Sequence, residues 1–435
     1  MDDQIEKRPD RQARAALSLF QELLDGCRPR DFSVRLWDGT VLPPERSSPA
    51  RFSLVVNNPG ALRRMLREPP ELSLAEAFIY KDIDIEGDIT AVFDLADHLI
   101  DRKFGLARRL RMALQFLRLP VPQRRTGNDR NAPRLDGACH SREKDDQAIS
   151  YHYDVSNDFY RLWLDREMVY SCAYFDHPAQ DLNSAQKQKL DYICRKLRFR
   201  AGDRVLDIGC GWGGLLLHAV REYGVLARGI TLSREQAALA RERIRKAGLE
   251  EQCSVEVSDY RDVRDGEGFD KLVSIGMFEH VGRELLPLYF RKAWTLLRPG
   301  GVFLNHGISW NAAFRPRKGP TFSDRYVFPN GDLLPLSVTL SAAERSGFEV
   351  RDVESLREHY ALTLGHWVRR LEENLPEACR LAGETTCRIW RLYMAGSAHG
   401  FSTGKLNVYQ ALLVKPNDGR SGLPLTRCDW YRSGP

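Results

Sequence analysis

The chain contains no apolar run close to the roughly 20 residues that a membrane-spanning helix needs. Residues 1–20 are charged and lack the apolar core of a secretory signal. These two absences predict a cytoplasmic protein with no helical membrane anchor.

Metal-binding and phosphate-binding motifs are also missing. The nine cysteines are scattered and form no CxxC pair, which is typical of reduced thiols and not of a disulfide framework or a zinc site. We therefore expect no metal site. No GxxxxGK[ST] segment occurs, and this argues against a nucleoside triphosphate as the ligand.

Positive charge is concentrated in one stretch. The whole chain carries a net charge of +6, yet residues 101–125 alone hold eight Arg or Lys and one Asp. In "FGLARRLRMALQFLR" apolar residues alternate with arginines, a pattern typical of helices that lie on an anionic membrane surface. The alternative is a packing helix with a solvated basic side. Nucleic acid is not expected as a partner, because no recognition motif accompanies the charge.

Three regions differ in composition. Residues 1–119 have the pattern of a small α/β unit, with a hairpin expected at Asp38-Gly39. Residues 120–147 are polar and rich in Pro, Arg, Asp and Gly, which predicts a flexible linker. From 148 to 435, helical patterns separate strand-like runs and predict an α/β fold with a mostly parallel sheet covered on both faces. The expected strands are 204–208, 225–230, 254–257, 271–275, 302–307, 349–353 and 406–413.

A glycine turn follows the first of these strands in "RVLDIGCGWGG", residues 204–214. A strand, a glycine turn and a helix place backbone N–H groups at the carboxyl edge of a sheet, where ligands bind. Asp207 would repel a pyrophosphate but suits a cationic ligand. S-adenosylmethionine carries both an ammonium and a sulfonium and fits this description. The alternative is an ordinary tight turn without a ligand.

Several motifs together resemble one family. "VLDIGCGWGG", "GITLSREQ", "SDYRD", "VSIGMFEHVG", "LRPGGVFLNHGIS", "HYDVSNDFYRLWLDREMVYSCAYF" and "HYALTLGHW" occur in the order found in cyclopropane-fatty-acyl-phospholipid synthases and the related mycolic acid cyclopropane synthases. The resemblance runs from about residue 150 to 415, and "LSLAEAFIYKDIDIEGDI" is similar to the amino-terminal lipid-side domain of the longer members. It implies a Rossmann-like class I methyltransferase sheet whose last strand is antiparallel.

The resemblance also implies the residues that contact the cofactor. To these we add Asp207, which the resemblance does not supply and which we expect to contact the cofactor because it lies near the end of the first strand. No Asp or Glu ends the second strand to bind the ribose hydroxyls, and Thr231 and Gln236 occupy that neighbourhood in the family. Helix capping and solvent exposure are the alternative for these two. The expected cofactor contacts are Tyr170, Ser171, Asp207, Gly209, Gly211, Thr231, Leu232, Gln236 and Tyr260.

Addition of a methyl cation to an alkene leaves a carbocation, so the site must exclude water and hold a base that is not itself methylated. In the family a bicarbonate ion fills this role. The matching positions here are Cys172, Glu279, His306, Ile308 and Tyr360. We expect the first, third and fifth to donate side-chain hydrogen bonds, Ile308 to offer its backbone N–H, and Glu279 to accept from the ion or to orient His306. Cys172 should stay protonated.

Each of these five residues also has a structural interpretation. A buried cysteine or tyrosine is most often part of the core, a histidine in an apolar strand is usually satisfied there, and Glu279 could cap a helix. Their position favours the functional interpretation, because Glu279 and His306 fall near the carboxyl ends of expected strands.

We therefore expect a peripheral enzyme on the inner face of the membrane that forms cyclopropane rings on unsaturated phospholipid acyl chains. The nearest alternative stops before ring closure and gives methyl- or methylene-branched chains. A non-catalytic lipid-binding protein and a small-molecule methyltransferase are the other hypotheses. Head group, double-bond position and oligomeric state are left open, with a homodimer among the options.

Overall fold

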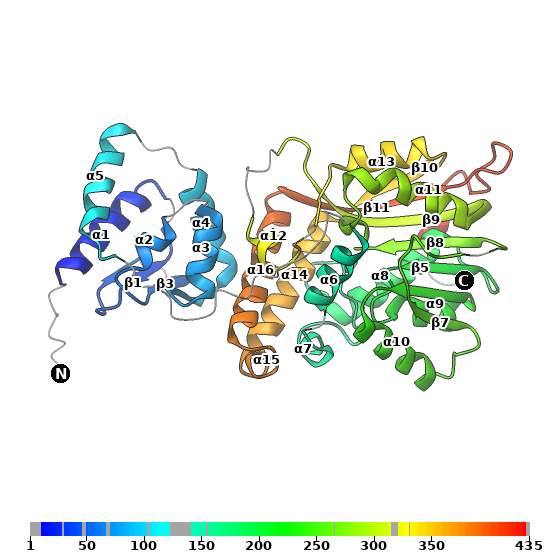
Figure 1. Cartoon of the computed structure of the whole chain (residues 1–435), viewed down its shortest axis with the longest axis horizontal. Coiled ribbons are helices and arrows are strands. Elements are labelled where there is room, and N and C mark those ends of the chain that lie inside the picture. Colours follow the sequence, from blue (N-terminus) through cyan, green and yellow to red (C-terminus); the bar gives the residue numbers. More distant parts are fainter. Residues whose placement is uncertain are drawn as a thin grey trace. The chain divides into compact units, whose positions relative to one another are not determined.

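The computed structural model describes residues 10–431 except 28–29, 46–48, 67–69, 102–104, 122–140, 154, 265, 315–320 and 330. The chain divides into two compact units (Figure 1). The amino-terminal unit contains residues 1–132, 317–327 and 384–396, and the sheet unit contains 133–316, 328–383 and 397–435. The amino-terminal unit thus includes two segments from within the region that we expected to form the catalytic domain.

The amino-terminal unit has a four-stranded sheet in the order β2-β1-β3-β4. The hairpin expected at Asp38-Gly39 is confirmed, because Val34 pairs antiparallel with Leu42 across it. Its elements are α1 (Arg11–Leu24), β1 (Ser33–Arg35), β2 (Val41–Leu42), β3 (Phe52–Val56), α2 (Ala61–Met65), α3 (Pro70–Ile79), β4 (Ile83–Gly87), η1 (Ile89–Ala91), α4 (Val92–Asp101), α5 (Leu106–Arg118) and α12 (Phe322–Tyr326).

One buried arginine explains why residues 384–396 belong to this unit. Arg388 lies in α16 (Glu384–Ser402), and its guanidinium donates to the carbonyls of Phe78 at 2.7 Å and Ile83 at 3.0 Å. It also pairs with Asp84 at 3.2 Å and stacks 4.1 Å from the Phe78 ring centroid. The polar and apolar sides of the guanidinium are therefore both satisfied within the unit.

The sheet unit has seven strands in the order β10-β11-β9-β8-β5-β6-β7. β11 runs antiparallel to both of its neighbours, and the other neighbouring strands are parallel. The class I methyltransferase sheet expected from the sequence is confirmed. The strands are β5 (Arg204–Ile208), β6 (Leu226–Thr231), β7 (Cys253–Val257), β8 (Phe269–Ile275), β9 (Leu297–Trp310), β10 (Glu349–Ser355) and β11 (Leu406–Val414).

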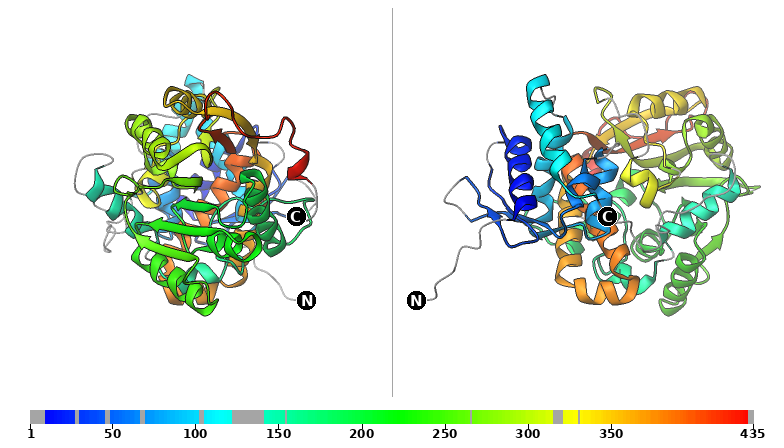
Figure 2. Two further views of the ribbon diagram at one scale, coloured as in Figure 1. Left: turned by 90° about the vertical axis from the view of Figure 1, so that its right-hand side faces the viewer. Right: turned by 60° about the vertical axis from the view of Figure 1, so that its left-hand side comes forward.

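Helices cover both faces of this sheet (Figure 2). Neighbouring strand residues point to opposite faces, so Val205 and Leu304 pack in one core cluster while Leu206 and Phe303 pack in the other. The first cluster is covered by α8 (Leu182–Leu197), α9 (Gly214–Tyr223) and α10 (Arg234–Lys246), and the second by α11 (Leu286–Leu296) and α13 (Leu336–Arg345). The remaining elements are α6 (Arg142–Tyr153), α7 (Asn157–Arg161), η2 (Phe278–His280), η3 (Arg283–Leu285), α14 (Arg357–Glu373), α15 (Leu375–Ala382) and η4 (Cys428–Trp430).

The prediction of a linker over residues 120–147 is wrong for the last residues of that range. Residues 122–140 lie outside the described residues, but α6 begins at Arg142. Arg142 pairs with Asp262 at 2.9 Å, and Asp145 pairs with Arg261 at 3.1 Å. The polar side chains that suggested a solvated linker instead bind the loop that follows β7. Across the ranges described, no helix combines the length and the apolar character needed to cross a bilayer.

Candidate functional site

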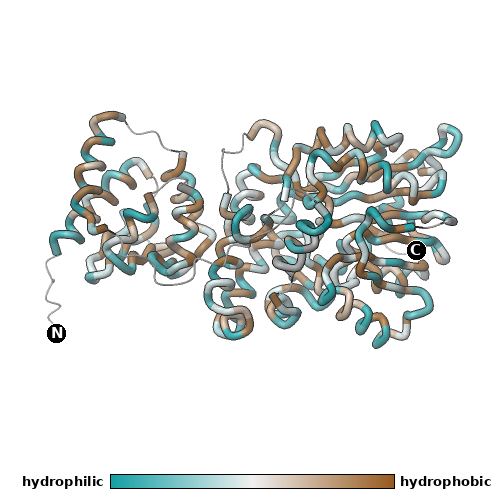
Figure 3. Tube along the Cα trace, in the orientation of Figure 1, coloured by the Kyte–Doolittle hydropathy of each residue, from teal (hydrophilic) through white to brown (hydrophobic). Residues whose placement is uncertain are grey.

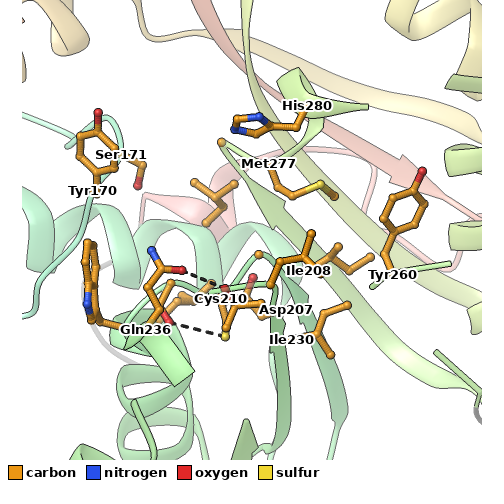
Figure 4. A pocket seen from close by; sticks show the side chains of 18 of the residues that line it. Tyr170, Ser171, Asp207, Ile208, Cys210, Ile230, Gln236, Tyr260, Met277 and His280 are labelled. Atoms are coloured by element: carbon orange, nitrogen blue, oxygen red, sulfur yellow. Dashed lines mark hydrogen bonds between the residues drawn. The ribbon is translucent and has the colours of Figure 1, made fainter. Parts of the chain in front are cut away.

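A pocket opens at the carboxyl edge of β5, β6 and β8 (Figure 4). Tyr170 and Ser171 lie at one side of it and Tyr260 at the other, with Asp207 and Gln236 between them (Figure 4). All nine residues expected to contact the cofactor line this one pocket: Tyr170, Ser171, Asp207, Gly209, Gly211, Thr231, Leu232, Gln236 and Tyr260. The sheet therefore gathers side chains from a sequence span of 91 positions, from residue 170 to 260, around one space.

The glycine turn is shaped by two close approaches. Gly209 has a φ of +88°, and a Cβ there would lie 2.8 Å from the Met277 Cβ. A Cβ at Gly214 would lie 2.8 Å from the Glu167 carbonyl oxygen. Both positions need glycine, because the chain after β5 is packed against the segments that form the pocket walls.

Asp207 and Lys189 are buried charged residues at the pocket. Asp207 is 3% exposed, and its Oδ1 has no hydrogen-bond partner within the described part of the chain. Burial raises the pKa of Asp207 to about 7, although the nearby charge of Lys189 opposes this. Lys189 is fully buried on α8 and donates to the Ser171 Oγ at 2.9 Å. An unpaired carboxylate oxygen in a pocket is complementary to a cationic ligand.

Lys189 was missed by the sequence reasoning. It lies in a regular helical pattern with other lysines, and nothing in that pattern distinguishes the one lysine that turns inward. Burial lowers its pKa to about 8, against the opposing charges of Asp165, Cys172 and Asp207.

Thr231 and Gln236 form a buried pair at the end of β6. The Thr231 hydroxyl donates to the Gln236 Oε1 at 2.8 Å, and both residues line the pocket. The residue that caps α10 is Ser233 and not Thr231 or Gln236, because the Ser233 Oγ accepts from the Gln236 amide at 3.2 Å. The alternative of solvent exposure is therefore wrong for Thr231 and Gln236, which are 6% and 5% exposed.

The segment after β7 contributes a charged wall. Asp259 accepts from the Arg261 amide and from its Nε, both at 2.8 Å, and Arg261 also reaches Asp145 on α6. Tyr260, between them, has a buried hydroxyl without a partner among the described residues. Of the residues in this wall, only Tyr260 was expected from the sequence to contact the cofactor.

None of the five expected catalytic residues is among those that line this pocket. Four of them are buried: Cys172, Glu279, His306 and Tyr360. His306 lies in β9 opposite Ile275, the last residue of β8, so it is level with the carboxyl edge of the parallel strands. It is not at the end of its own strand, because β9 continues to Trp310 paired with β11 alone. Glu279 lies in η2, directly after β8.

Glu279 and Ile308 are in contact, which changes the role expected for Ile308. The Ile308 amide donates to the Glu279 Oε1 at 2.7 Å, so this N–H is engaged and not free for an ion. Burial raises the pKa of Glu279 to about 7, although the hydrogen bond from Ile308 opposes the shift. Glu279 is thus positioned by the backbone of β9.

Two buried polar atoms in this group have no partner in the described structure: the Glu279 Oε2 and the His306 Nε2. Burial, together with the charges of Lys189 and Lys196, lowers the pKa of His306 well below its ordinary value. A buried acceptor and a buried imidazole nitrogen left unsatisfied point to a small polar group that would complete them.

Cys172 and Tyr360 share one backbone acceptor, the carbonyl of Leu356, which is the N-cap residue of α14. The Cys172 thiol donates to the Ala173 carbonyl at 3.2 Å and reaches the Leu356 carbonyl at 3.7 Å. The Tyr360 amide donates to that same Leu356 oxygen at 3.0 Å. Burial raises the pKa of the Cys172 thiol well above its ordinary value, so the thiol is neutral.

Aromatic rings connect the pocket with this second group. The Tyr170 ring lies 5.2 Å from that of Trp367, and the Trp367 ring lies 6.0 Å from that of Tyr360. Trp367 is fully buried. An aromatic wall of this kind excludes water and can stabilise a cation by its ring faces.

Comparison with known proteins agrees with this geometry. The family described as mycolic acid cyclopropane synthetase matches residues 140–411, and a domain family of unknown function matches residues 19–101. A probable fatty acid methyltransferase of Pseudomonas putida is 43% identical, over 92% of this chain and 96% of its own length. The cyclopropane-fatty-acyl-phospholipid synthase of Escherichia coli K12 is 37% identical over 61% of this chain and 66% of its own.

A solved structure also matches the sheet unit's fold. The mycolic acid cyclopropane synthase CmaA1, complexed with SAH and CTAB, superposes with a TM-score of 0.59 at 33% identity, covering 62% of this chain and 97% of that one. The family match spans more than half of the 435 residues. The chain belongs to the mycolic acid cyclopropane synthetase family, with the class I methyltransferase fold.

Proposed function

We propose that this protein binds S-adenosylmethionine in the pocket and transfers its methyl carbon to a cis double bond of an unsaturated phospholipid acyl chain, closing a cyclopropane ring. One observation carries the proposal. A pocket with an unpaired buried carboxylate, Asp207, lies in the same unit as the unsatisfied atoms of Glu279 and His306. The first suits a cationic methyl donor, and the second suits a small ion that accepts a proton.

The reaction balances without a further reactant. The alkene carbon forms a bond to the methyl carbon as the bond from that carbon to sulfur breaks, which leaves a cation on the neighbouring chain carbon. A proton then leaves the transferred carbon, and the electron pair of its C–H bond closes the ring. The products are S-adenosylhomocysteine, the cyclopropane and one proton.

Bicarbonate fits the residues that would surround it. When bound, it would supply a base that is too poor a nucleophile to be methylated by S-adenosylmethionine. The Glu279 Oε2 could accept its hydroxyl hydrogen, and the His306 Nε2 could donate to one of its oxygens. The Cys172 thiol could donate to it only by turning away from the Ala173 carbonyl. The Ile308 amide does not fit this role as expected, because it already donates to Glu279.

A branched product is the second candidate, and a specific comparison favours it. The relative that matches 92% of this chain is named a probable fatty acid methyltransferase, whereas the E. coli cyclopropane synthase matches 61%. A hydride shift from the methylated carbon to the neighbouring cationic carbon moves the positive charge onto the methylated carbon. Loss of a proton from the transferred methyl group then gives a methylene branch instead of a ring. The two products are isomers that differ only in the fate of the cation.

We also propose that α5 attaches the protein to the bilayer, and that the amino-terminal unit is the lipid-side domain. Apolar residues recur between the arginines along α5 (Figure 3). The exposed leucines among them form what we call the apolar face of α5. Leu106, Leu110, Leu114 and Leu117 are 75%, 60%, 59% and 70% exposed. This face should insert among the lipid head groups of the inner membrane surface.

The charge on α5 is smaller than the sequence implied. Arg108 pairs with Asp25 at 2.6 Å, and Arg111 pairs with Glu22 at 2.9 Å, both on or next to α1. Two of the basic residues therefore hold α5 on the unit, as the packing alternative expected, while the leucines stay outside. Membrane attachment should depend on the apolar face more than on charge.

The proposed reaction is tested by incubating the protein with methyl-labelled S-adenosylmethionine and vesicles of a monounsaturated phospholipid. The extracted acyl chains are analysed by mass spectrometry and proton NMR. A chain that gains one CH₂ with cyclopropyl protons supports ring closure, and vinylidene protons support the branched product. Vesicles of saturated phospholipid are the control, and label incorporated equally into both would contradict the proposal.

A further inference from the structure

A buried row of polar side chains leads from α8 to His306. Gln410 on β11 lies directly opposite His306 on β9 in the antiparallel register. Its Nε2 lies 3.2 Å from the His306 Nδ1, and its Oε1 accepts from the Lys196 Nζ at 2.9 Å. Gln410 is 0% exposed and Lys196 1% exposed, so water does not compete for these groups.

From this row we infer that Gln410 and Lys196 are positioning residues that fix the tautomer of His306, with the proton on Nε2 and the lone pair on Nδ1. The inference deepens the proposed function and rests on it, because it assigns His306 the part of a hydrogen-bond donor in the site.

The direction of each hydrogen bond in this row follows from whether the groups can donate or accept. An ammonium only donates, so Lys196 must face the amide oxygen of Gln410. The amide NH₂ then faces the imidazole, and since an NH₂ donates, the His306 Nδ1 must accept. A neutral imidazole has one N–H, and it is left on Nε2. The orientation of the amide, which electron density alone rarely decides, is here determined by the lysine.

Several groups keep Lys196 charged and in place. Its ammonium forms an ion pair with Glu354, and Tyr192 donates to the same Glu354 Oε2 at 3.0 Å. The ammonium also lies 4.6 Å from the Tyr192 ring centroid and 5.5 Å from that of Trp430. Burial lowers the pKa of Lys196, and the charge of Glu354 opposes this shift. The charges that face the row are therefore Glu354 and Asp352 on β10, Arg427 and Lys189.

With this tautomer, His306 offers the site a hydrogen-bond donor and does not act as a base. The His306 Nε2 is buried and has no partner among the described residues, so its N–H remains for an anionic group. Two neighbouring cations disfavour the imidazolium, which would bring a second positive charge close to a carbocation. Gln410 thus keeps His306 neutral and turned so that it stabilises negative charge.

The tautomer can be read directly in the full-length protein. Nitrogen-15 NMR of protein labelled in histidine distinguishes a protonated ring nitrogen from a bare one, and His306→Asn assigns the His306 signals by their loss. We expect a protonated Nε2 and a bare Nδ1. In Gln410→Glu the carboxylate accepts from Nδ1 and should reverse the tautomer or protonate both nitrogens. In Lys196→Met the amide can turn, and the two tautomers should mix.

Gln186→Glu is the matched control. Gln186 is also fully buried, and its amide donates to the carbonyls of Val169 and Ser171 and not to a histidine. It should leave the His306 signals unchanged. Should Gln410→Glu fail to fold, Gln410→Met removes the same hydrogen bond without adding charge, and Lys196→Met is independent of both.

Activity separates this inference from the proposed function. Gln410→Glu should lower kcat roughly 10- to 100-fold with an unchanged KM for S-adenosylmethionine, as expected for a lost transition-state donor. A proton on Nδ1 in the unaltered protein, or signals that do not change in Gln410→Glu and Lys196→Met, would overturn the inference whatever the products. The expected tautomer without any acyl product would instead overturn the proposed function and leave the inference standing.

Discussion

The Glu279 carboxylate is held by the Ile308 amide at 2.7 Å, so a residue just after β8 is fixed by the backbone of β9. One of its oxygens is thereby occupied, while the other remains buried without a partner in the described residues.

Glu279→Gln should change how stability depends on pH. The ordinary pKa of this carboxyl is 4.5 and burial raises it to about 7 in the folded protein. Between these values the unfolded chain loses the proton and the folded chain keeps it, so the free energy of unfolding falls as pH rises through this window. Glutamine removes this term, which is on the order of 3 kcal/mol above the window.

Urea unfolding at about pH 4.5 and about pH 8 measures the difference between the two proteins. At the higher pH, the free energy of unfolding of Glu279→Gln should rise relative to that of the unaltered protein. Glu250→Gln, at an exposed site, is the control and should show no such rise. An equal difference at both pH values would show that Glu279 is ionised in the fold.

Asp207→Asn should weaken binding of S-adenosylmethionine by roughly 10- to 100-fold, because a hydrogen bond to a charged group contributes about 1.5–3 kcal/mol. Binding to the unaltered protein should strengthen from about pH 6 to about pH 7.5, as the carboxyl with a pKa of about 7 ionises. Asn should abolish that dependence. Isothermal titration calorimetry measures both quantities.

The control for this change is Asp203→Asn, since Asp203 lies directly before the first residue of β5, at the end of the strand away from the pocket. Its affinity should match that of the unaltered protein. A similar loss in both variants would mean that the effect comes from the strand and not from a contact with the ligand.

Cys172 should resist thiol reagents in the folded protein, since the thiol is buried and its pKa is raised by that burial. Cys428, which is exposed, should react first and serves as the internal control. Peptide mapping after brief treatment with iodoacetamide gives the order. Rapid labelling of Cys172 would show an accessible thiolate and contradict the neutral donor.

Cys172→Ser should reduce turnover and leave cofactor binding intact, because serine keeps a donor at the position but with a shorter reach. His306→Ala should reduce turnover further, since it removes the donor altogether. Steady-state rates and calorimetry on the same samples separate the two effects. Unchanged rates in both variants would remove these residues from the site.

Replacement of Leu110 and Leu114 by Asn should weaken binding to phospholipid vesicles. Each leucine side chain that becomes buried in the bilayer contributes about 1.5–3 kcal/mol to the binding free energy. Arg109→Gln, a neighbouring exposed position on α5, should have the smaller effect and account for most of the salt dependence. Vesicle sedimentation at low and high salt measures this. Unchanged sedimentation of the leucine variant would favour α5 as a packing helix alone.

The sequence predicted the sheet and the pocket because both depend on local patterns. The alternation of strands and helices predicted the sheet, and the turn at Gly209 marked its ligand-binding edge. The family resemblance supplied the expected cofactor residues other than Asp207, and all nine line the pocket. Lys189, Lys196 and Gln410 could not be found this way. Each is one polar residue within a regular helix or strand, and its direction depends on a partner far along the chain, such as Gln410 for Lys196. The helix from Arg142 was missed for the same reason, because its ion pairs are with residues near 262.

The proposed reaction requires that a proton leave the transferred carbon itself. S-adenosylmethionine with a fully deuterated methyl group, supplied with monounsaturated phospholipid vesicles, tests this by mass spectrometry of the acyl product. We predict that the product carries two deuterons on the new carbon, whether it is a ring or a methylene branch. A product that keeps all three deuterons would contradict the proposed reaction.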